Sequence, residues 1–248
     1  MNVNDLEKRE EAFPIYIGYD DREADAAAVC RHSLIRHSTQ PLFITDLLQE
    51  KLRYTGLYRR KFHESGGQKF DDIDGKPFST AFSFTRFLVP AMQQYKGWAL
   101  FCDCDMLFRD DLRKIIDAAD ERYAVMVVKH LHNPTEGLKM DGQLQERYHR
   151  KNWSSFVLWN CAHPANMNLT VDAVNTESGG WLHAFSWLKD DEIGGLPEQW
   201  NWLEGWSGPM IDPANVHFTR GTPDMEGYRN IPYADEYRAE LALVEAAK

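Results

Sequence analysis

The sequence predicts one α/β domain built on a parallel β-sheet. Short apolar runs repeatedly end in Gly or Asp, as buried strands do where they enter a loop. An alanine-rich stretch of helical spacing, residues 24–37, separates the first two runs, and a strand-helix-strand opening is typical of a parallel sheet. The 248 residues fit a single domain and contain no internal repeat or low-complexity linker. We therefore expect a solvated arm over residues 1–12 and one domain over residues 13–248.

The elements follow in order along the chain. Residues 14–18 and 42–44 predict the first two strands, and the polar, glycine-punctuated residues 49–78 predict a long loop or excursion. A helix is expected over residues 79–95, where Ser79 or Thr80 can cap a stretch rich in Phe. The later elements are a strand over 98–101, a helix over 110–119, a strand over 123–128, a polar segment over 131–151, a strand over 156–159 and a last helix over 234–247.

The charge balance excludes some classes of partner. With 38 acidic and 28 basic side chains the formal net charge is -10, which disfavours nucleic acid and anionic membranes as partners. A phosphate substrate would therefore need local cations or a metal ion. The four cysteines have no CxxC spacing, and the charged N-terminus lacks the apolar core of a signal peptide. No run of about 18 apolar residues is present. We expect reduced, buried cysteines and a cytoplasmic protein without a transmembrane segment.

An acidic pair stands directly after the apolar run at residues 98–101. In extended backbone, residues two apart point to the same side, so Asp103 and Asp105 present two carboxylates together. Hard oxygen donors suit Mg²⁺ or Mn²⁺, and such an ion can also bind the phosphates of a leaving diphosphate. A D-x-D sequence alone is also compatible with a solvated turn or a helix cap.

Haloacid-dehalogenase-type phosphatases offer a second interpretation of this pair. They also place D-x-D after an apolar strand, with the first Asp as nucleophile. In that class the motif stands near the start of the domain and a Thr or Val follows two residues later, whereas here Leu107 occupies that position. About a hundred residues of α/β pattern also precede the pair, so this alternative is the weaker one.

Four segments, in order and at similar separations, make the chain resemble glycosyltransferase family 8, the retaining GT-A enzymes that include glycogenin and lipopolysaccharide galactosyltransferases. The segments are residues 15–20, Phe84-Thr85-Arg86-Phe87-Leu88-Val89-Pro90, Phe101-Cys102-Asp103-Cys104-Asp105 and Val216-His217-Phe218-Thr219-Arg220-Gly221. Arg86 lies 17 positions before Asp103, where the family has a basic donor-binding residue. The resemblance implies a Rossmann-like GT-A fold, in which helices flank a mostly parallel, mixed β-sheet.

It also implies an activity: transfer of a hexose from a UDP-sugar donor to a hydroxyl acceptor, such as a carbohydrate or glycolipid, with retention at the anomeric carbon. Catalysis would rest on positioning and electrostatics, without a side-chain nucleophile on the sugar. In this interpretation Asp103, Asp105 and His217 ligate Mn²⁺ or Mg²⁺, and Arg86 offsets the diphosphate charge.

The resemblance further implies contacts to the rest of the donor. Tyr19 and Asp20 are expected at the nucleoside, and Asn152 at the donor sugar, with Lys129 and His130 in a similar neighbourhood. Simpler roles remain open: Arg86 as a surface cation, His217 as a core histidine, Asn152 as a turn cap, Tyr19 as core.

Two features of the family are missing. Residues 221–224 lack the Lys that grips the diphosphate in the family, so Arg220 is the expected substitute. The family's Asp-Gln pair is not visible, and Asp190 or Asp191 is the candidate replacement. These losses leave open a non-catalytic protein that binds nucleotide sugars or carbohydrates. The polar residues 139–145 could form a lid or acceptor loop, and Trp202 and Trp206 an exposed acceptor surface.

Overall fold

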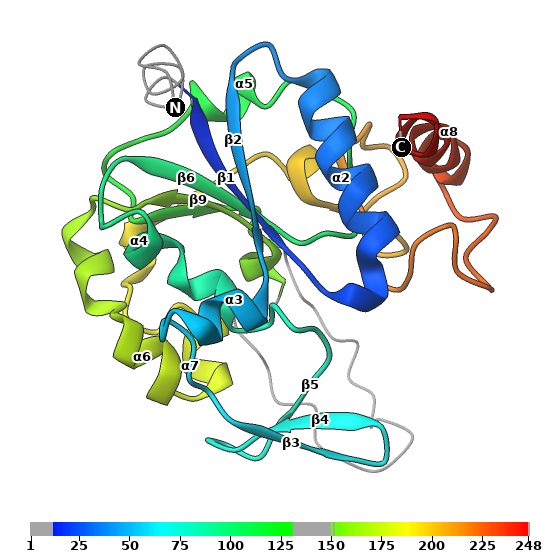
Figure 1. Ribbon diagram of the computed structural model, residues 1–248. Coiled ribbons are helices and arrows are strands. Elements are labelled where there is room, and N and C mark those ends of the chain that lie inside the picture. The colour runs from blue at the N-terminus through cyan, green and yellow to red at the C-terminus, as the bar shows by residue number, and fades with distance from the viewer. Residues whose placement is uncertain (1–11, 131–149, 151, 248) are drawn as a thin grey trace, which may run out of the picture.

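A six-stranded sheet forms the centre of the computed structural model, which describes residues 12–130, 150 and 152–247 (Figure 1). The strand order is β10-β8-β9-β6-β1-β2. These strands are β1 (Phe13–Gly18), β2 (Leu42–Leu47), β6 (Trp98–Cys102), β8 (Val125–Val127), β9 (Phe156–Asn160) and β10 (Ile193–Gly195). β1 pairs in parallel with β2 and β6, and β10 with β8, whereas β9 runs antiparallel to both β6 and β8. The predicted α/β class with a mostly parallel, mixed sheet is confirmed.

The middle strands are buried on both faces. All five residues of β9 and the last four of β6 are buried, and both sequences are continuous apolar runs rather than alternating ones. Such runs are typical of strands covered by layers on both sides. Phe101 and Trp159, with no exposed surface, belong to the main hydrophobic core.

Helix α2 (Ala24–His37) has the bounds that the alanine-rich stretch predicts. One side of it, including Val29, Cys30 and Leu34, is buried against the rest of the protein. The C-terminal helix α8 (Ala234–Ala246) packs beside it (Figure 1). The two are joined by buried Glu240, which accepts hydrogen bonds from Arg36 and pairs with His32 at 2.6 Å.

A second, three-stranded sheet joins the segment that follows β6 to the C-terminal part of the chain. It has the order β11-β12-β7 and consists of β7 (Met106–Phe108), β11 (Trp202–Leu203) and β12 (Asn215–His217). β12 runs antiparallel to β7, with His217 opposite Met106. Residues more than a hundred positions apart are thereby brought to the same place.

Residues 49–78 form an excursion with its own secondary structure, so the alternative of a long loop is wrong. This segment contains helix α3 (Gln49–Tyr54) and an antiparallel sheet of β3 (Phe62–Ser65), β4 (Gln68–Asp71) and β5 (Pro77–Phe78). Gly66 and Gly67, both with positive φ, form the two-residue turn between β3 and β4. Arg60, fully buried, donates two hydrogen bonds to Asp71 and two more to the carbonyls of Val174 and Glu177.

The expected helix over residues 79–95 is also wrong in extent. The chain forms only the 3₁₀ turn η2 (Thr85–Leu88) and helix α4 (Val89–Met92), then leaves helical backbone at Gln94 and Tyr95, both with positive φ. Every residue from 82 to 90 is buried, so the segment crosses the interior and has no solvent-exposed face. The remaining helices are α5 (Arg113–Ile116), α6 (Val171–Thr176) and α7 (Gly179–His183), with 3₁₀ turns η1 (Asp21–Glu23), η3 (Trp153–Ser155), η4 (Pro164–Asn168), η5 (Asp190–Glu192) and η6 (Glu198–Asn201).

Other expectations have mixed outcomes. All four cysteines are free and buried, as expected. Trp206 is exposed, as the proposed acceptor surface requires, but Trp202 is buried, so its assignment to that surface is wrong. The predicted arm over residues 1–12 falls almost wholly outside the described residues, as does the candidate lid at 139–145. Among the helices that the structure describes, none is long and apolar enough to cross a membrane.

Candidate metal centre

The two acidic residues of the D-x-D sequence stand where the central and second sheets meet. Asp103 follows β6, and its backbone N–H donates to the carbonyl of Ser155 at 2.9 Å. The carbonyl of Asp105, just before β7, accepts from the N–H of Phe218 at 2.9 Å. Both backbones are therefore fixed by hydrogen bonds to distant segments, and the second of these bonds holds the end of β12 against Asp105.

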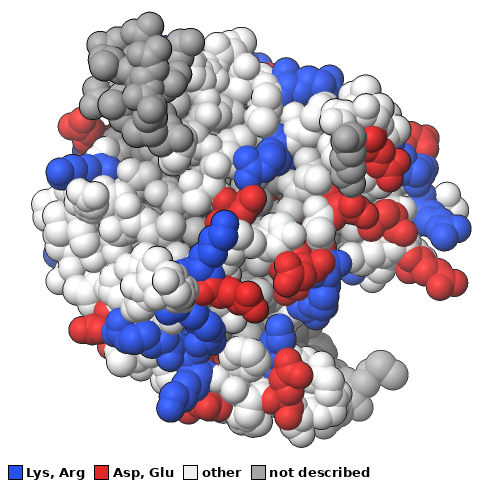
Figure 2. Space-filling view, in the orientation of Figure 1, with Lys and Arg blue, Asp and Glu red and all other residues white. Residues whose placement is uncertain are grey.

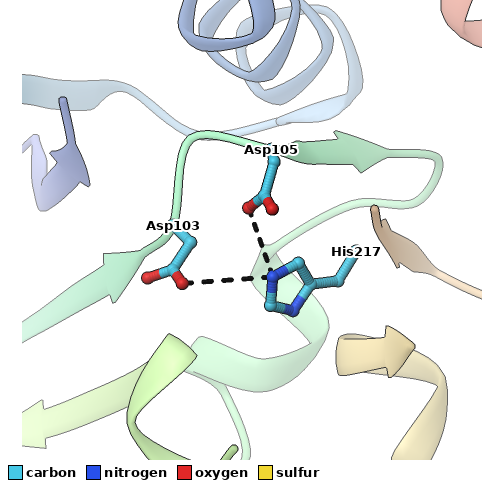
Figure 3. A group of neighbouring side chains, drawn as sticks. All are labelled: Asp103, Asp105 and His217. Carbon is cyan, nitrogen blue, oxygen red and sulfur yellow. Dashed lines mark ion pairs between the residues drawn. The ribbon is translucent and has the colours of Figure 1, made fainter. Parts of the chain in front are cut away.

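Three side chains converge at this point (Figure 3). One donor atom from each of Asp103, Asp105 and His217 lies within 4.8 Å of the others. The Nε2 atom of His217 is 3.2 Å from Oδ1 of Asp105 and 4.0 Å from Oδ2 of Asp103. The sequence-predicted metal ligands are thus brought together from segments more than a hundred residues apart.

The electrostatics of the cluster reflect its burial. Burial raises the pKa of Asp103 to about 7, and the Asp105 carboxylate acts in the same direction, while Arg86 and His217 oppose both. Burial acts to lower the pKa of His217, but the Asp105 and Asp103 carboxylates raise it above its ordinary value. Both shifts share one cause, the neighbouring carboxylates: two carboxylates held close together bind protons, or another cation, readily.

Arg86 supplies the nearest fixed positive charge. Its Nη1 lies 2.9 Å from Oδ1 of Asp103 and donates to the carbonyl of Ser154, also at 2.9 Å. The guanidinium packs over the ring of Phe101, 4.9 Å from the centroid. Because the side chain is buried, it is not a surface cation.

The donor set fits a hard divalent ion. Oδ1 of Asp103 and Oδ1 of Asp105 are buried; the first lies 2.9 Å from Nη1 of Arg86 and the second 3.2 Å from Nε2 of His217. Two buried carboxylates side by side are costly unless cations compensate their charge. Two carboxylates and one imidazole nitrogen are suitable ligands for Mn²⁺ or Mg²⁺.

The cluster opens into a cleft of about 1200 Å³. Its wall includes Arg86, Asn152, Arg220 and Lys76, the last from the turn before β5. On the face shown in Figure 2, basic and acidic side chains are intermixed beside a hollow. A cleft of this size can hold a ligand larger than a single sugar.

The residues expected at the nucleoside lie beside this cleft and do not line it. Asp20 is buried and accepts hydrogen bonds from the side chain and N–H of Arg22 and from the N–H of Ala81. Burial alone would raise the pKa of Asp20, but these donors hold it at about 2. Asp20 therefore orders the loop after β1, and Tyr19 packs against the core.

The residues expected near the donor sugar are separated by the structure. Asn152 is exposed on the cleft wall, in left-handed backbone with φ of 63°. The side chain of Lys129 donates to the carbonyl of Ile193 at 2.6 Å, and neither Lys129 nor His130 lines the cleft. Burial lowers the pKa of His130 to about 4, so this imidazole is neutral near pH 7.

Arg220 reaches the cleft but is already paired. Its guanidinium donates to both carboxylate oxygens of Glu204, at 2.7 to 3.0 Å, and Glu204 is buried. The α-carbon of Gly205 leaves room for it: a Cβ there would lie 2.4 Å from Nη2 of Arg220. Asp190, one candidate for the missing acidic residue, forms an ion pair with Arg150.

Sequence reasoning missed several groups at the site. His183 lines the cleft, and its Nδ1 lies 2.8 Å from Oγ of Ser154; burial lowers its pKa to about 3. Glu23 also lines the cleft and accepts a hydrogen bond from the thiol of Cys104 at 3.2 Å. Asn201 lies 2.9 Å from Nδ1 of His217. The order of residues in the chain carries no signal for these contacts, because the partners are far apart in sequence.

Comparison with known proteins gives one relative at the level of sequence. The chain is 42% identical over 243 residues to "Protein CDI" of Arabidopsis thaliana, an alignment that covers 96% of this chain and 89% of that protein. No family model matches the chain.

Solved structures share the fold. The galactosyltransferase LgtC, in complex with donor and acceptor sugar analogues, superposes with a TM-score of 0.58 at 11% identity, covering 93% of this chain and 96% of that one. For the glycosyltransferase GlyE of Streptococcus pneumoniae TIGR4 the TM-score is 0.57 at 14% identity, covering 95% and 62%. For the bifunctional glycosyltransferase WbbM it is 0.54 at 16%, covering 93% and 52%, so the chain spans about half of WbbM. These similarities show the GT-A fold.

Proposed function

We propose that this chain, which belongs to the same family as Protein CDI of Arabidopsis thaliana, is a metal-dependent glycosyltransferase. The observation that carries the proposal is the cluster of Asp103, Asp105 and His217 on the wall of a large cleft in a GT-A fold. In finer terms, it transfers a hexose from a UDP-sugar to a hydroxyl acceptor in the manner of glycosyltransferase family 8. A cytoplasmic location is part of the same proposal.

Asp103, Asp105 and His217 would hold Mn²⁺ or Mg²⁺. When bound, such an ion supplies positive charge for the diphosphate of the donor as the bond to the sugar breaks. Arg86 adds a second, permanent charge from the neighbouring wall, held in place by the carbonyl of Ser154 and the ring of Phe101. The fixed orientation of this guanidinium favours stabilisation of developing charge without reorganisation.

The remaining donor contacts are assigned by their place on the cleft. Asn152, exposed on the wall, is suited to contact the sugar. Tyr19 and Asp20 would set the shape of the nucleoside end, Asp20 through the loop it orders. Lys129 and His130 would act indirectly, through Trp153 beside Asn152: the indole N–H of Trp153 donates to the carbonyl of His130 at 3.4 Å, and Nζ of Lys129 lies 5.7 Å from the centre of the Trp153 ring. Transfer with retention needs no side-chain nucleophile if the acceptor hydroxyl is positioned beside the leaving group.

A non-catalytic protein that binds nucleotide sugars is the second candidate. It is favoured by one observation: the charge of Arg220, the expected replacement for the missing diphosphate-binding Lys, is compensated by Glu204. The phosphatase alternative loses its structural basis because the fold is of the GT-A type.

The test is release of UDP from a panel of UDP-sugars, with UDP-galactose first because LgtC is a galactosyltransferase. The wild type is assayed with Mn²⁺, with Mg²⁺ and with EDTA. Asp105→Asn removes the charge of one proposed ligand while keeping the size of the side chain, and Asp120→Asn, at a partly exposed acid paired with Arg122, is the matched control. Metal-dependent release that is lost only in Asp105→Asn supports the enzyme. UDP binding without turnover favours the binding protein, and absence of UDP binding contradicts both.

A further inference from the structure

We propose that Asn201 is a positioning residue that fixes the tautomer of His217, so that the Nε2 lone pair faces Asp103 and Asp105. The inference deepens the proposed metal site and rests on it. It comes from a chain of hydrogen bonds whose direction is set at one end by a backbone carbonyl.

Asn201 has a fixed backbone and no contact with solvent. It ends the 3₁₀ turn η6 and is fully buried. The turn is tied to the second sheet twice: Asn215 Nδ2 donates to the carbonyl of Trp200 at 3.0 Å, and the N–H of Ala214 donates to the carbonyl of Gln199 at 2.9 Å. The carboxamide therefore starts from a defined place beside β12.

The direction of each hydrogen bond follows from the one before. The carbonyl of Asn152 can only accept, so the hydroxyl of Ser155, 2.9 Å away, donates its single hydrogen there. Oγ of Ser155 is then left as an acceptor for Nδ2 of Asn201 at 3.0 Å. The amide of Asn201 must consequently present its oxygen to His217, and Nδ1 of His217 donates to Oδ1 of Asn201 at 2.9 Å.

This direction determines what His217 offers to the cleft. A neutral imidazole has one N–H and one lone pair, so a proton held on Nδ1 leaves the lone pair on Nε2. Nε2 is the atom that lies 3.2 Å from Asp105. In the other tautomer an N–H would occupy that place and no metal ligand would be available. Hydrogen bonds of this kind are the usual means by which proteins orient a ligating histidine.

The same chain joins the metal site to the expected sugar site. It begins at the carbonyl of Asn152, whose own side chain lies exposed on the cleft wall. A shift of the Asn152 backbone would therefore be felt at His217 through Ser155 and Asn201.

The first test measures metal affinity, without any reaction. Binding of Mn²⁺, alone and with UDP, is followed by the electron paramagnetic resonance signal of the free ion. Asn201→Leu removes the acceptor, and we expect affinity to fall by about 10- to 100-fold. Asn201→Asp keeps an acceptor facing Nδ1 and is expected to retain the wild-type affinity.

A matched control separates this effect from loss of folding. Asn166 is also fully buried and uses its carboxamide fully, with bonds to the carbonyls of Ala124 and Asn160 and from Trp187, but it does not line the cleft. Asn166→Leu should lower the melting temperature and leave Mn²⁺ affinity unchanged. The inference is overturned if Asn201→Leu binds Mn²⁺ as the wild type does, or if Asn201→Asp loses as much affinity as Asn201→Leu.

The second test reads the tautomer directly in the wild type, free of metal. In protein labelled with ¹⁵N-histidine, the His217 signals are identified by their loss in His217→Gln. At a pH where the ring is neutral, we expect a protonated Nδ1 and an unprotonated Nε2; a protonated Nε2 overturns the inference. If the wild type binds no Mn²⁺ even with UDP, the proposed function fails, and the tautomer measurement still decides the role of Asn201 by itself.

Discussion

Replacement of Arg86 by Met tests how far one buried charge supports both the fold and the reaction. Met keeps an unbranched apolar side chain beside Phe101 but removes two interactions: the ion pair with Asp103 and the hydrogen bond to the carbonyl of Ser154. Breaking a buried ion pair from one side costs about 3–5 kcal/mol, because the remaining charge is left uncompensated. Asp103 can take up a proton, since its pKa is already about 7, so the lower end of that range is expected.

For a chain of this length, a loss of about 3 kcal/mol corresponds to a decrease in melting temperature of about 6–12 °C. Calorimetry on the wild type, Arg86→Met and Arg86→Lys measures it, with UDP release measured in parallel at a temperature where all three are folded. We expect Arg86→Lys to recover part of the stability, since an ammonium keeps the charge but not the fork of donors. A melting temperature within about 2 °C of the wild type in Arg86→Met would refute the reasoning about burial. Unchanged turnover in the folded variant would refute the role in the reaction.

Three further predictions concern residues around the site. Because the pKa of Asp20 is about 2 in the folded state against an ordinary value of 3.8, its stabilisation is present above about pH 4 and is lost as the pH falls towards 2. Asp20→Asn should therefore lower the free energy of unfolding by about 1–2 kcal/mol at pH 7, a range reduced because Arg22 is exposed. At pH 2 the same substitution should cost almost nothing. Equal losses of unfolding free energy at the two pH values, measured by chemical unfolding, would contradict this prediction. Asp71→Ala leaves Arg60 buried without its carboxylate partner and should lower stability by about 3–5 kcal/mol. The double variant Arg60→Met/Asp71→Leu should recover most of that stability. Thermal unfolding of both variants checks whether the two residues are coupled. Gly18→Ala would place a Cβ 2.4 Å from Cδ2 of Phe82, and we expect a loss of stability of about 1–3 kcal/mol. UDP binding should also weaken, because Nε of Arg86 donates to the carbonyl of Phe82 at 3.3 Å. An unaltered melting temperature would show instead that Phe82 moves freely.

The parts of the fold that local pattern determines could be predicted from the sequence. Helix α2 follows from its alanines, and β6 and β9 from apolar runs that stay buried on both faces. The hairpin of β3 and β4 carries a signal that could have been used, because Gly66-Gly67 between two short runs is a hairpin turn. The segment around Arg86 could not be assigned correctly, because it is buried on every side and leaves no helical periodicity to detect.

The same distinction applies to the site. Asp103 and Asp105 are adjacent to a recognisable strand, so their association is a local property. His217 was placed beside them only through a family resemblance, and β12 is what brings it there. Asn201 and Glu204 act through contacts that the tertiary structure creates, and their residue types are common in loops.

The measurement that tests the central proposal most directly is the location of the metal ion. Crystals grown with UDP and Mn²⁺ are measured near the manganese absorption edge. We predict one anomalous peak bound by Asp103, Asp105 and Nε2 of His217, with the diphosphate of UDP on its open side. A peak elsewhere, or UDP bound in the cleft with no peak at these three residues, would contradict the proposal.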